Sequence, residues 1–475
     1  MLLLLLAQAH VIHVVDEATG RGVPLVELET VHKTRLYTDS AGVAVFDGPE
    51  LLGREVYLHV RSDGYELPAD GFGFRGARVK MEPKGRTTLK VKRLLAAERL
   101  YRVTGQGIYA ESIKAGDAPP LKESNGGVLG QDTVQTIAWK GKLWWFWGDT
   151  ERAAYPLGQF STSGATSPMP DPSVGVELTY WVDDQGFSRK MIDVPNAEGP
   201  VWIDALMVLR DDHGTERLYA HYIVVKELGD VRRRGLCAWN EKTERFVPVF
   251  PFDVDEPLHP RGQPVREGEW LYFPSPYALV RVKADAASVS NPRRYEAFTC
   301  LKPGGRMSKD PPLDRVWGWK ADTAPVDEKT QEELIKKGAL KPEEAWFRLK
   351  SESGERVVAH MGTVCRNAHR KKWIAIFHQS WGKPSMLGEV WYAEADQPWG
   401  PFERGVKIVT HQKYSFYNVV QHPEFDQDGG RRVYFEGTYT KMFTNVETAT
   451  PRYDYNQIMY RLDLDDPRLA WAQRR

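Results

Sequence analysis

The sequence has no excess of charge of either sign. Lys and Arg together number 64, and Asp and Glu together also number 64, so the formal net charge is zero. Proteins that bind nucleic acid usually carry a basic excess that neutralises phosphate groups. The composition therefore predicts no nucleic-acid partner.

Cysteine is scarce. The three cysteines, Cys237, Cys300 and Cys365, lie far apart and form no Cys-x-x-Cys pair. This count excludes a disulfide framework, and the spacing excludes a cysteine zinc site. We expect three buried thiols that pack as small apolar side chains. A Cys237–Cys300 bridge is the alternative.

Cofactor motifs are also missing. The sequence has no His-Glu-x-x-His pair, no histidine-rich tract, no EF-hand loop and no glycine-rich phosphate loop. One acidic turn, residues 424–430, alternates side-chain oxygens with two glycines and could hold calcium weakly. A plain hairpin turn explains it better. We therefore predict no cofactor and no metal site.

No apolar run approaches the roughly 20 residues that span a bilayer. A short run at residues 1–9, five leucines followed by Ala-Gln-Ala, resembles the apolar core and cleavage site of a secretory signal. It predicts a secreted or periplasmic protein. The alternative is a buried first strand that continues into residues 10–15.

Short strands with intervening turns dominate the sequence. In residues 10–95 the expected strands are residues 11–15, 25–29, 42–46, 55–60 and 88–92, several of which alternate polar with apolar side chains. Such spacing is typical of a β-sandwich. The segments Asp16–Gly20, Val23–Val26 and Thr38–Phe46 together resemble the carboxypeptidase-regulatory-like sandwich. In that family the module is usually an accessory domain, so the resemblance implies no chemistry for it.

A glycine- and proline-containing connector, residues 96–124, precedes five loosely repeated units in residues 125–475. Each unit has a polar start, an apolar strand, a turn and an aromatic-rich second strand. The starts lie near Asp132, Asp204, Arg261, Gly362 and Tyr417, and the second strands are residues 142–147, 217–225, 269–273, 372–377 and 432–436. Five such units predict an all-β chain, a sandwich followed by a five-bladed β-propeller. A jelly roll and a right-handed β-helix are the alternatives.

One helix is expected in a charged insertion between two units. Thr330 and Glu333 have capping-box spacing, and Gly338 follows a basic end, as at a helix C-terminus. We interpret it as a surface decoration; a lid over the site is the alternative.

Candidate catalytic residues follow from propeller geometry. First strands begin, and second strands end, at the same end of the central channel. Asp132 and Asp204 are first-strand starts, and Asp149 and Glu436 are second-strand ends. Carboxylates that lie close together raise one another's pKa, so that one can donate a proton while another activates water or attacks a sugar.

The pattern is similar to the five-bladed propeller glycosidases, which include arabinanases, xylosidases and invertase relatives. Gly-Gln-Asp132, Trp-Ile-Asp204 and the stretch 390–402 carry the resemblance. It implies Asp132 as base or nucleophile and Asp204 as modulator of the acid. The third unit, His259-Pro-Arg-Gly-Gln263, offers no carboxylate where several relatives place the acid. Glu436 is therefore the predicted acid, with Glu389 as a substitute.

Other polar and aromatic side chains at this end are predicted to bind the sugar, with Trp147, Trp381 and Tyr417 as stacking rings. The full set is Asp149, Trp147, His360, His378, Trp381, Glu389, Tyr417, Asn418 and His422. Each has a plain structural interpretation as a turn, core or surface residue. The sequence thus favours an exported glycoside hydrolase acting on poly- or oligosaccharides. A carbohydrate-binding protein without activity is the second hypothesis, and a polysaccharide lyase with Arg261 as charge neutraliser is the third.

Overall fold

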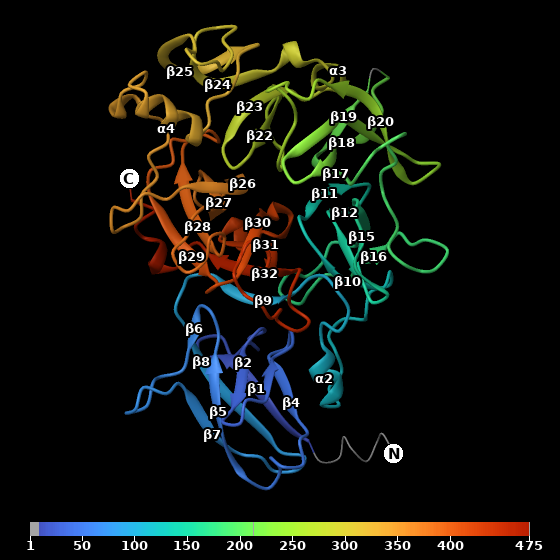
Figure 1. Ribbon diagram of the computed structural model, residues 1–475, viewed down its shortest axis with the longest axis vertical. Coiled ribbons are helices and arrows are strands. Elements are labelled where there is room, and N and C mark those ends of the chain that lie inside the picture. Colours follow the sequence, from blue (N-terminus) through green and yellow to red (C-terminus); the bar gives the residue numbers. More distant parts are fainter. Residues whose placement is uncertain (1–8, 212, 475) are drawn as a thin grey trace.

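The chain is almost entirely β-structure, which confirms the predicted all-β class (Figure 1). The computed structural model describes residues 9–211 and 213–474. The predicted signal segment, residues 1–9, lies outside these residues except for Ala9.

The N-terminal part consists of two four-stranded sheets, which we call the two-sheet region. One sheet has the order β4-β1-β8-β6 and the other the order β3-β2-β5-β7. The strands are β1 (His10–Asp16), β2 (Glu27–Thr30), β3 (Arg35–Tyr37), β4 (Val43–Phe46), β5 (Glu55–Arg61), β6 (Tyr65–Glu66), β7 (Gly76–Lys80) and β8 (Arg86–Arg93). Five of them overlap the strands expected from the sequence; β3, β6 and β7 were not expected.

One hydrophobic core joins the two sheets of this region. Ile12 and Phe46 from the first sheet pack in the same buried cluster as Leu28, Leu58 and Val79 from the second. Strand β8 explains the arrangement locally, because Leu89 and Val91 are buried while their neighbours along the strand are exposed. This period of two places one face of the strand on the core.

The remaining chain forms five antiparallel sheets in succession, which we call sheets 1 to 5 of the five-sheet region. Sheet 1 is β11 (Gln135–Trp139), β12 (Lys142–Trp147), β15 (Ser163–Ser167) and β16 (Thr179–Tyr180). Sheet 2 is β17 (Val201–Arg210), β18 (Glu216–Glu227), β19 (Asp230–Asn240) and β20 (Arg245–Phe252). Sheet 3 is β21 (Val265–Glu267), β22 (Trp270–Pro274), β23 (Ala278–Lys283), β24 (Glu296–Leu301) and β25 (Leu313–Ala321).

Sheets 4 and 5 complete this region. Sheet 4 is β26 (Ala359–Asn367), β27 (Lys372–Gln379), β28 (Glu389–Ala395) and β29 (Gly405–Thr410). Sheet 5 is β30 (Ser415–Gln421), β31 (Arg432–Thr440), β32 (Asn456–Asp463) and, at its edge, β9 (Glu98–Arg102), which comes from the connector. Figure 1 shows the five sheets around a common centre. Strand β9, which precedes sheet 1 in the sequence, pairs with β32, the last strand of the chain.

Smaller elements lie between the sheets. A three-stranded sheet is formed by β10 (Val128–Gln131), β13 (Thr150–Arg152) and β14 (Tyr155–Gln159). The helical turns are α2 (Ala110–Lys114), α3 (Ala286–Val289), η2 (Pro292–Arg294), η3 (Pro342–Glu344), η4 (Pro423–Phe425), η5 (Asp428–Gly430) and η6 (Pro467–Leu469).

The expected helix is present but begins earlier than the sequence pattern indicates. Helix α4 spans Glu328–Lys336, and its N-cap is Asp327, whose carboxylate accepts from the amide of Thr330 at 2.8 Å. Thr330 therefore lies inside the first turn, because a preceding aspartate is an equally good cap. Gly338 follows the helix with φ of 70°, as expected for the glycine after a C-cap.

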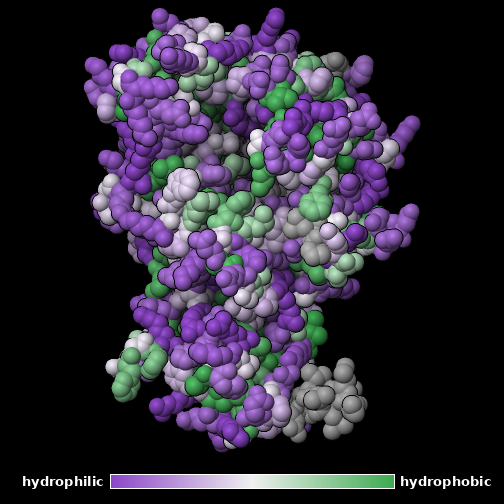
Figure 2. All heavy atoms as spheres, viewed as in Figure 1, coloured by the Kyte–Doolittle hydropathy of each residue, from purple (hydrophilic) through white to green (hydrophobic). Residues whose placement is uncertain are grey.

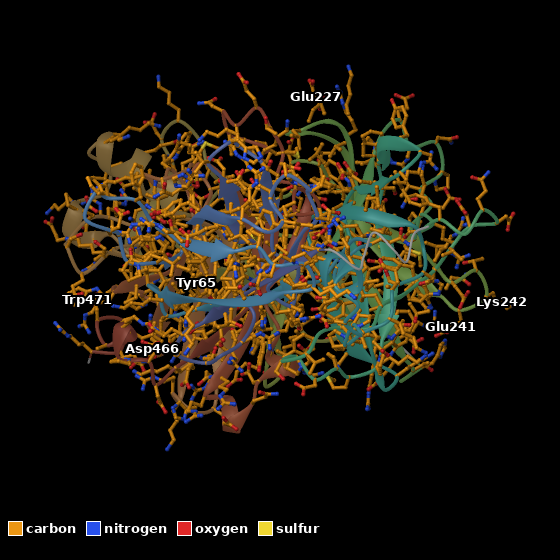
Figure 3. The ribbon with its side chains drawn as sticks, turned by 90° about the horizontal axis from the view of Figure 1, so that it is seen from below. Tyr65, Glu227, Glu241, Lys242, Asp466 and Trp471 are labelled. Carbon is orange, nitrogen blue, oxygen red and sulfur yellow. The ribbon has the colours of Figure 1, made fainter. Side chains whose placement is uncertain are left out.

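The two-sheet region contacts sheet 5 through buried polar groups. The hydroxyl of Tyr453 donates to the carbonyl of Thr38 at 2.6 Å and accepts from the amide of Leu25 at 3.2 Å. Arg99 of β9 donates to the carbonyl of Pro24 and lies over the ring of Tyr65. In the view from below, Tyr65 lies well inside the molecule, whereas Glu241 and Lys242 lie at its edge (Figure 3).

The cysteines behave as expected. Cys237, Cys300 and Cys365 are buried and free. Within residues 9–211 and 213–474, no helix is long and apolar enough to cross a membrane. The face drawn in Figure 2 is mostly hydrophilic, with smaller apolar patches over the middle of the five-sheet region.

Candidate active site at the inner strand starts

One backbone feature recurs at four of the five predicted unit starts, although Asp204 and Tyr417 lie inside β17 and β30 and not at their first residues. A residue in the left-handed conformation follows Asp132, Asp204, Arg261 and Tyr417; these residues are Thr133 (φ 55°), Ala205 (φ 52°), Gly262 (φ 64°) and Asn418 (φ 51°). In β17 and β30 it coincides with a shift of the strand register. A non-glycine residue rarely adopts this conformation, and bulges of this kind re-aim side chains next to functional sites.

The starts converge as expected from the sequence. The side-chain amide of Asn418 donates to the hydroxyl of Thr133 at 2.6 Å, which joins sheet 5 to the start of sheet 1. The side-chain amide of Gln263 donates to the carbonyl of Val134 at 3.2 Å, although 129 residues separate them. The amide of Ala205 donates to the carbonyl of Gly262 at 2.9 Å. Sheets 1, 2, 3 and 5 therefore meet here.

Asp132 and Asp149 are joined to each other and to two aromatic donors by hydrogen bonds. One carboxylate oxygen of Asp132 accepts from the amide of Asp149 at 3.0 Å, and the other accepts from the Tyr417 hydroxyl at 2.9 Å. The carboxylate of Asp149 accepts from the indole of Trp202 at 2.7 Å. Both aspartates are half-buried, whereas Tyr417 is buried.

Burial perturbs the proton affinity of both carboxyl groups. It raises the pKa of Asp149 to about 7; the Trp202 indole opposes this rise, and the charge of Asp132 adds to it. Burial also raises the pKa of Asp132, but hydrogen bonds from Tyr417 and Tyr455 to its ionised form oppose the rise. At neutral pH this environment can hold a proton on Asp149, next to a second carboxyl group in a different hydrogen-bonding environment.

Asp204 lies nearby in a different arrangement. One of its oxygens is 2.7 Å from Nδ1 of His221, and the other accepts from the amide of Gly262 at 2.9 Å. Its side chain keeps about a third of its exposure, at 34%. Asp204 lies two residues after Trp202 on β17, so the donor to Asp149 and this carboxylate share one strand. This position suits the modulating role predicted for Asp204, and that role stays a prediction.

Glu436, the predicted acid, does not join this cluster. Its side chain is fully buried, and Oε1 is 2.7 Å from Nε2 of His422. The His422 ring packs against Trp145 and Phe425, and its Nδ1 is 3.1 Å from the Thr136 hydroxyl. On β31, Glu436 lies two residues before Thr438, whose hydroxyl accepts from the amide of Thr133 at 3.1 Å. The pair lies between sheets 5 and 1, where a sugar would not reach it.

The three predicted stacking rings differ in exposure. Trp147 is buried and stacks on Trp145, so the structure corrects its assignment, because neither face of the ring is open to a sugar. Tyr417 is also buried and serves Asp132 through its hydroxyl. Trp381 is 76% exposed and follows β27, at the same end of the region. Of the three, Trp381 is the ring that is open to a ligand.

The other predicted binding residues are dispersed over sheet 4 and its neighbours. His378 is buried and lies 4.7 Å from the exposed His360, measured between ring centroids, and burial lowers the pKa of His378 well below its ordinary value. Glu389 is buried and bonded to Lys407 at 2.7 Å, which explains it as a structural ion pair.

A metal site finds no support in the side chains that the structure describes, among which no group of three or more His, Cys, Asp or Glu could hold an ion. In the acidic turn, Asp428 is paired with Arg431 and Arg432. Burial raises the pKa of Asp426, in the same turn, to about 7.

Three contributors were not identified from the sequence. Trp202 was expected only as part of the Trp-Ile-Asp204 motif, without a role of its own. Its position two residues before Asp204 places both side chains on the same face of β17. His221 lies opposite Asp204 in the ladder of β17 and β18, a register that no local signal gives. Tyr455 precedes β32 and carries no sequence signal for its proximity to Asp132.

Solved structures resemble this chain only at low sequence identity. No family model and no curated protein matches the chain. Among solved structures, the GH43_1 enzyme from Xanthomonas citri complexed with xylotriose is 13% identical, with 73% of this chain and 88% of that chain covered and a TM-score of 0.35. An α-L-arabinanase from Penicillium chrysogenum complexed with arabinobiose is 12% identical, with 72% and 98% covered and a TM-score of 0.36.

A third solved structure is an N-acetylgalactosamine deacetylase from F. plautii in complex with blood group B trisaccharide. It is 10% identical, with 79% of this chain and 97% of that chain covered and a TM-score of 0.38. Likenesses of this size do not assign a substrate or a reaction to this chain.

Proposed function

We propose that this protein is a glycoside hydrolase in which Asp149 is the general acid and Asp132 the base or nucleophile. The observation that carries the proposal is the pair of half-buried carboxyl groups, one with a pKa of about 7 and the other hydrogen-bonded by Tyr417. Two carboxyl groups in unlike environments are what glycosidic bond cleavage requires.

The reaction balances with these two groups alone. The proton of Asp149 moves to the glycosidic oxygen as the bond from that oxygen to the anomeric carbon breaks. Either water attacks the anomeric carbon while Asp132 takes its proton, or Asp132 attacks and water later releases the sugar. The anomeric configuration of the first product distinguishes these routes.

The domain architecture is also proposed here. We interpret the two-sheet region as an accessory β-sandwich and sheets 1 to 5 as the blades of one five-bladed propeller. Their consecutive order and the edge strand β9, which joins the first and last parts of the region, support this interpretation. Export, suggested by residues 1–9, is part of the same proposal.

The test is incubation of the purified protein with a panel of neutral and acidic polysaccharides. Release of reducing ends without absorbance from unsaturated products, lost in Asp132→Asn, is the expected result. Reducing ends with such absorbance would identify a lyase instead. Failure to cleave any member of the panel would overturn the hydrolase.

A carbohydrate-binding protein without activity is the second candidate. The complete burial of Glu436 and the His221 contact of Asp204 favour it, because two of the three predicted catalytic carboxylates are already engaged within the protein. It predicts glycan binding that survives Asp132→Asn, with no product released by the wild-type protein.

A further inference from the structure

Sheet 3 presents a cation at the position where sheets 1 and 2 present carboxylates. Arg261 precedes the left-handed Gly262 as Asp132 precedes Thr133 and Asp204 precedes Ala205. The contact between the amide of Gly262 and Asp204 Oδ2 places this arginine beside the acidic part of the site. The left-handed residue that follows each of these side chains is therefore shared by two carboxylates and one cation in neighbouring parts of the site.

Arg261 is joined by a second arginine that also lacks a carboxylate partner. Within the described chain, no carboxylate oxygen lies within 4.0 Å of the guanidinium of Arg234 or Arg261. Arg261 donates to the carbonyl of Pro257, and Arg234 contacts the ring of His259. The Nε atom of each arginine is buried without a hydrogen-bond partner.

Such a pair is costly unless a ligand completes it. A partly buried cation without a carboxylate in direct contact loses hydration, and more distant charges compensate for only part of that loss. Burial lowers the pKa of both guanidinium groups, and the charge of Asp204 opposes this effect for each, with smaller contributions from Asp255 at Arg234 and from Asp327 at Arg261. Both oxygens of Asp204 are already engaged, by His221 and by Gly262. The remaining donors of the arginines are available to an anion.

A cavity of about 510 Å³ lies against this cluster, and His259 and Arg261 are part of its wall. Three carboxylates also line it. Glu256 accepts from the amide of Leu258, and Asp253 accepts from the amide of Asp255, so both are turned to their own loop. Asp255 is exposed, and Arg306 across the cavity is paired with Asp322. Of the cations on this wall, Arg261 is the one without a carboxylate partner among the described residues, and Arg234 adjoins the wall through its contact with His259.

We propose that Arg261, supported by Arg234 through the ring of His259, forms a subsite for a negatively charged substituent of the sugar substrate, a carboxylate or a sulfate ester. Guanidinium groups suit both anions, because their planar donors match a pair of oxygens. The inference rests on the proposed action on carbohydrates and narrows the substrate to acidic sugars.

Calorimetric titration of the wild-type protein tests it with three probes: an oligogalacturonate, a sulfated galactan oligosaccharide and a neutral xylo-oligosaccharide. We expect at least one acidic probe to bind at least about tenfold more tightly than the neutral one, since hydrogen bonds to charged groups contribute about 1.5–3 kcal/mol. Whichever acidic probe prevails identifies the anion. Equal affinity for acidic and neutral probes, or no binding of either acidic probe, overturns the subsite.

The variant Arg261→Met removes the charge at similar length and should abolish the preference. Arg266→Gln is the matched control, because Arg266 lies on β21, is exposed and bonds only the carbonyl of Gly268 in its own turn. If Arg261→Met does not fold, Arg234→Met and a salt series replace it. Added salt should weaken acidic binding severalfold and leave neutral binding unchanged. A preference that survives these changes contradicts the subsite.

Failure of this inference is separable from failure of the proposed function. Cleavage of neutral polymers that depends on Asp132, with no preference for acidic probes, would retain the hydrolase and remove the subsite. A preference for acidic probes that depends on Arg261, with no cleavage, would retain the subsite and remove the hydrolase.

Discussion

Two polar clusters lie where sheets 5 and 1 meet, joined through the contact between Thr133 and Thr438, and they differ in burial and in hydrogen-bond partners. Asp132 and Asp149 are half-buried, bonded to backbone, tyrosine and indole donors. Glu436 and His422 are buried, and aromatic rings pack against the histidine. Thr438 and Glu436 are separated by about 7 Å along β31, at roughly 3.4 Å per residue.

This comparison separates two reasons for a carboxylate to be in a protein interior. A buried carboxyl group with a close hydrogen-bond partner holds the interior together, and removing that contact lowers stability. A carboxyl group that keeps access to solvent, with raised pKa, can exchange a proton with a ligand. Four substitutions test whether the two clusters divide in this way.

The largest effect is expected from Asp132→Asn. The amide keeps the size of the side chain but can neither attack carbon nor take a proton, so kcat/KM should fall by about 10³-fold or more. The free energy of unfolding should change little by comparison. An Asp132→Asn variant with wild-type turnover would remove the cluster from the mechanism.

Asp149→Asn should reduce kcat by about 10²- to 10³-fold, because protonation of the leaving oxygen is lost. The wild-type rate should also fall as pH rises through about 7, where Asp149 ionises, and this limb should vanish in the variant. Steady-state kinetics between pH 4 and 9 measure both. A basic limb that persists in Asp149→Asn assigns the acid to another group.

The same substitution has a defined effect on stability. The folded-state pKa of about 7 lies above the ordinary value, so folding favours the protonated carboxyl group. Its contribution is fully present below about pH 4 and is lost as pH rises to 7. Asp149→Asn should therefore gain stability relative to wild type between pH 4 and 8, as measured by urea unfolding. A constant difference across this range contradicts the raised pKa.

Glu436→Gln should give the opposite result from Asp132→Asn. Removing one partner from a buried hydrogen-bonded pair should lower the free energy of unfolding by about 1–3 kcal/mol. Turnover of the folded fraction should stay within about threefold of wild type. Loss of turnover at unchanged stability would instead restore Glu436 as the acid.

Trp202→Phe is expected to have the smallest effect. The variant keeps an aromatic ring but removes the indole donor to Asp149, which favours the ionised carboxylate. A hydrogen bond of about 1 kcal/mol corresponds to somewhat less than one pKa unit. The basic limb of the rate profile should move upward by about that amount. A downward shift would contradict the proposed role of the indole.

Much of the fold could be predicted because its strands are local patterns. The second strands of the five units overlap β12, β18, β22, β27 and β31, which are continuous apolar or aromatic runs bounded by turns. Strands β3, β6 and β7 were missed because they are short and largely polar, and their pairing depends on neighbours distant in the sequence. The predicted start of α4 lies three residues too late, because Asp327 and Thr330 are both good N-cap residues and Asp327 is the one that caps the helix.

The sequence by itself determined that the chain is β-structure and that its cysteines are buried. It placed Asp132 and Asp149 next to strand ends, but Asp204 and Glu436, which it also placed there, lie inside β17 and β31. Only the tertiary structure decided how deep each carboxylate lies and which donor it contacts. Glu436 and Asp149 both follow aromatic runs, yet Glu436 is buried against His422, which follows β30 of the same sheet, and Asp149 accepts from the Trp202 indole of sheet 2. Depth and partner set the pKa through desolvation and hydrogen bonding, and both depend on packing between sheets that no local pattern encodes.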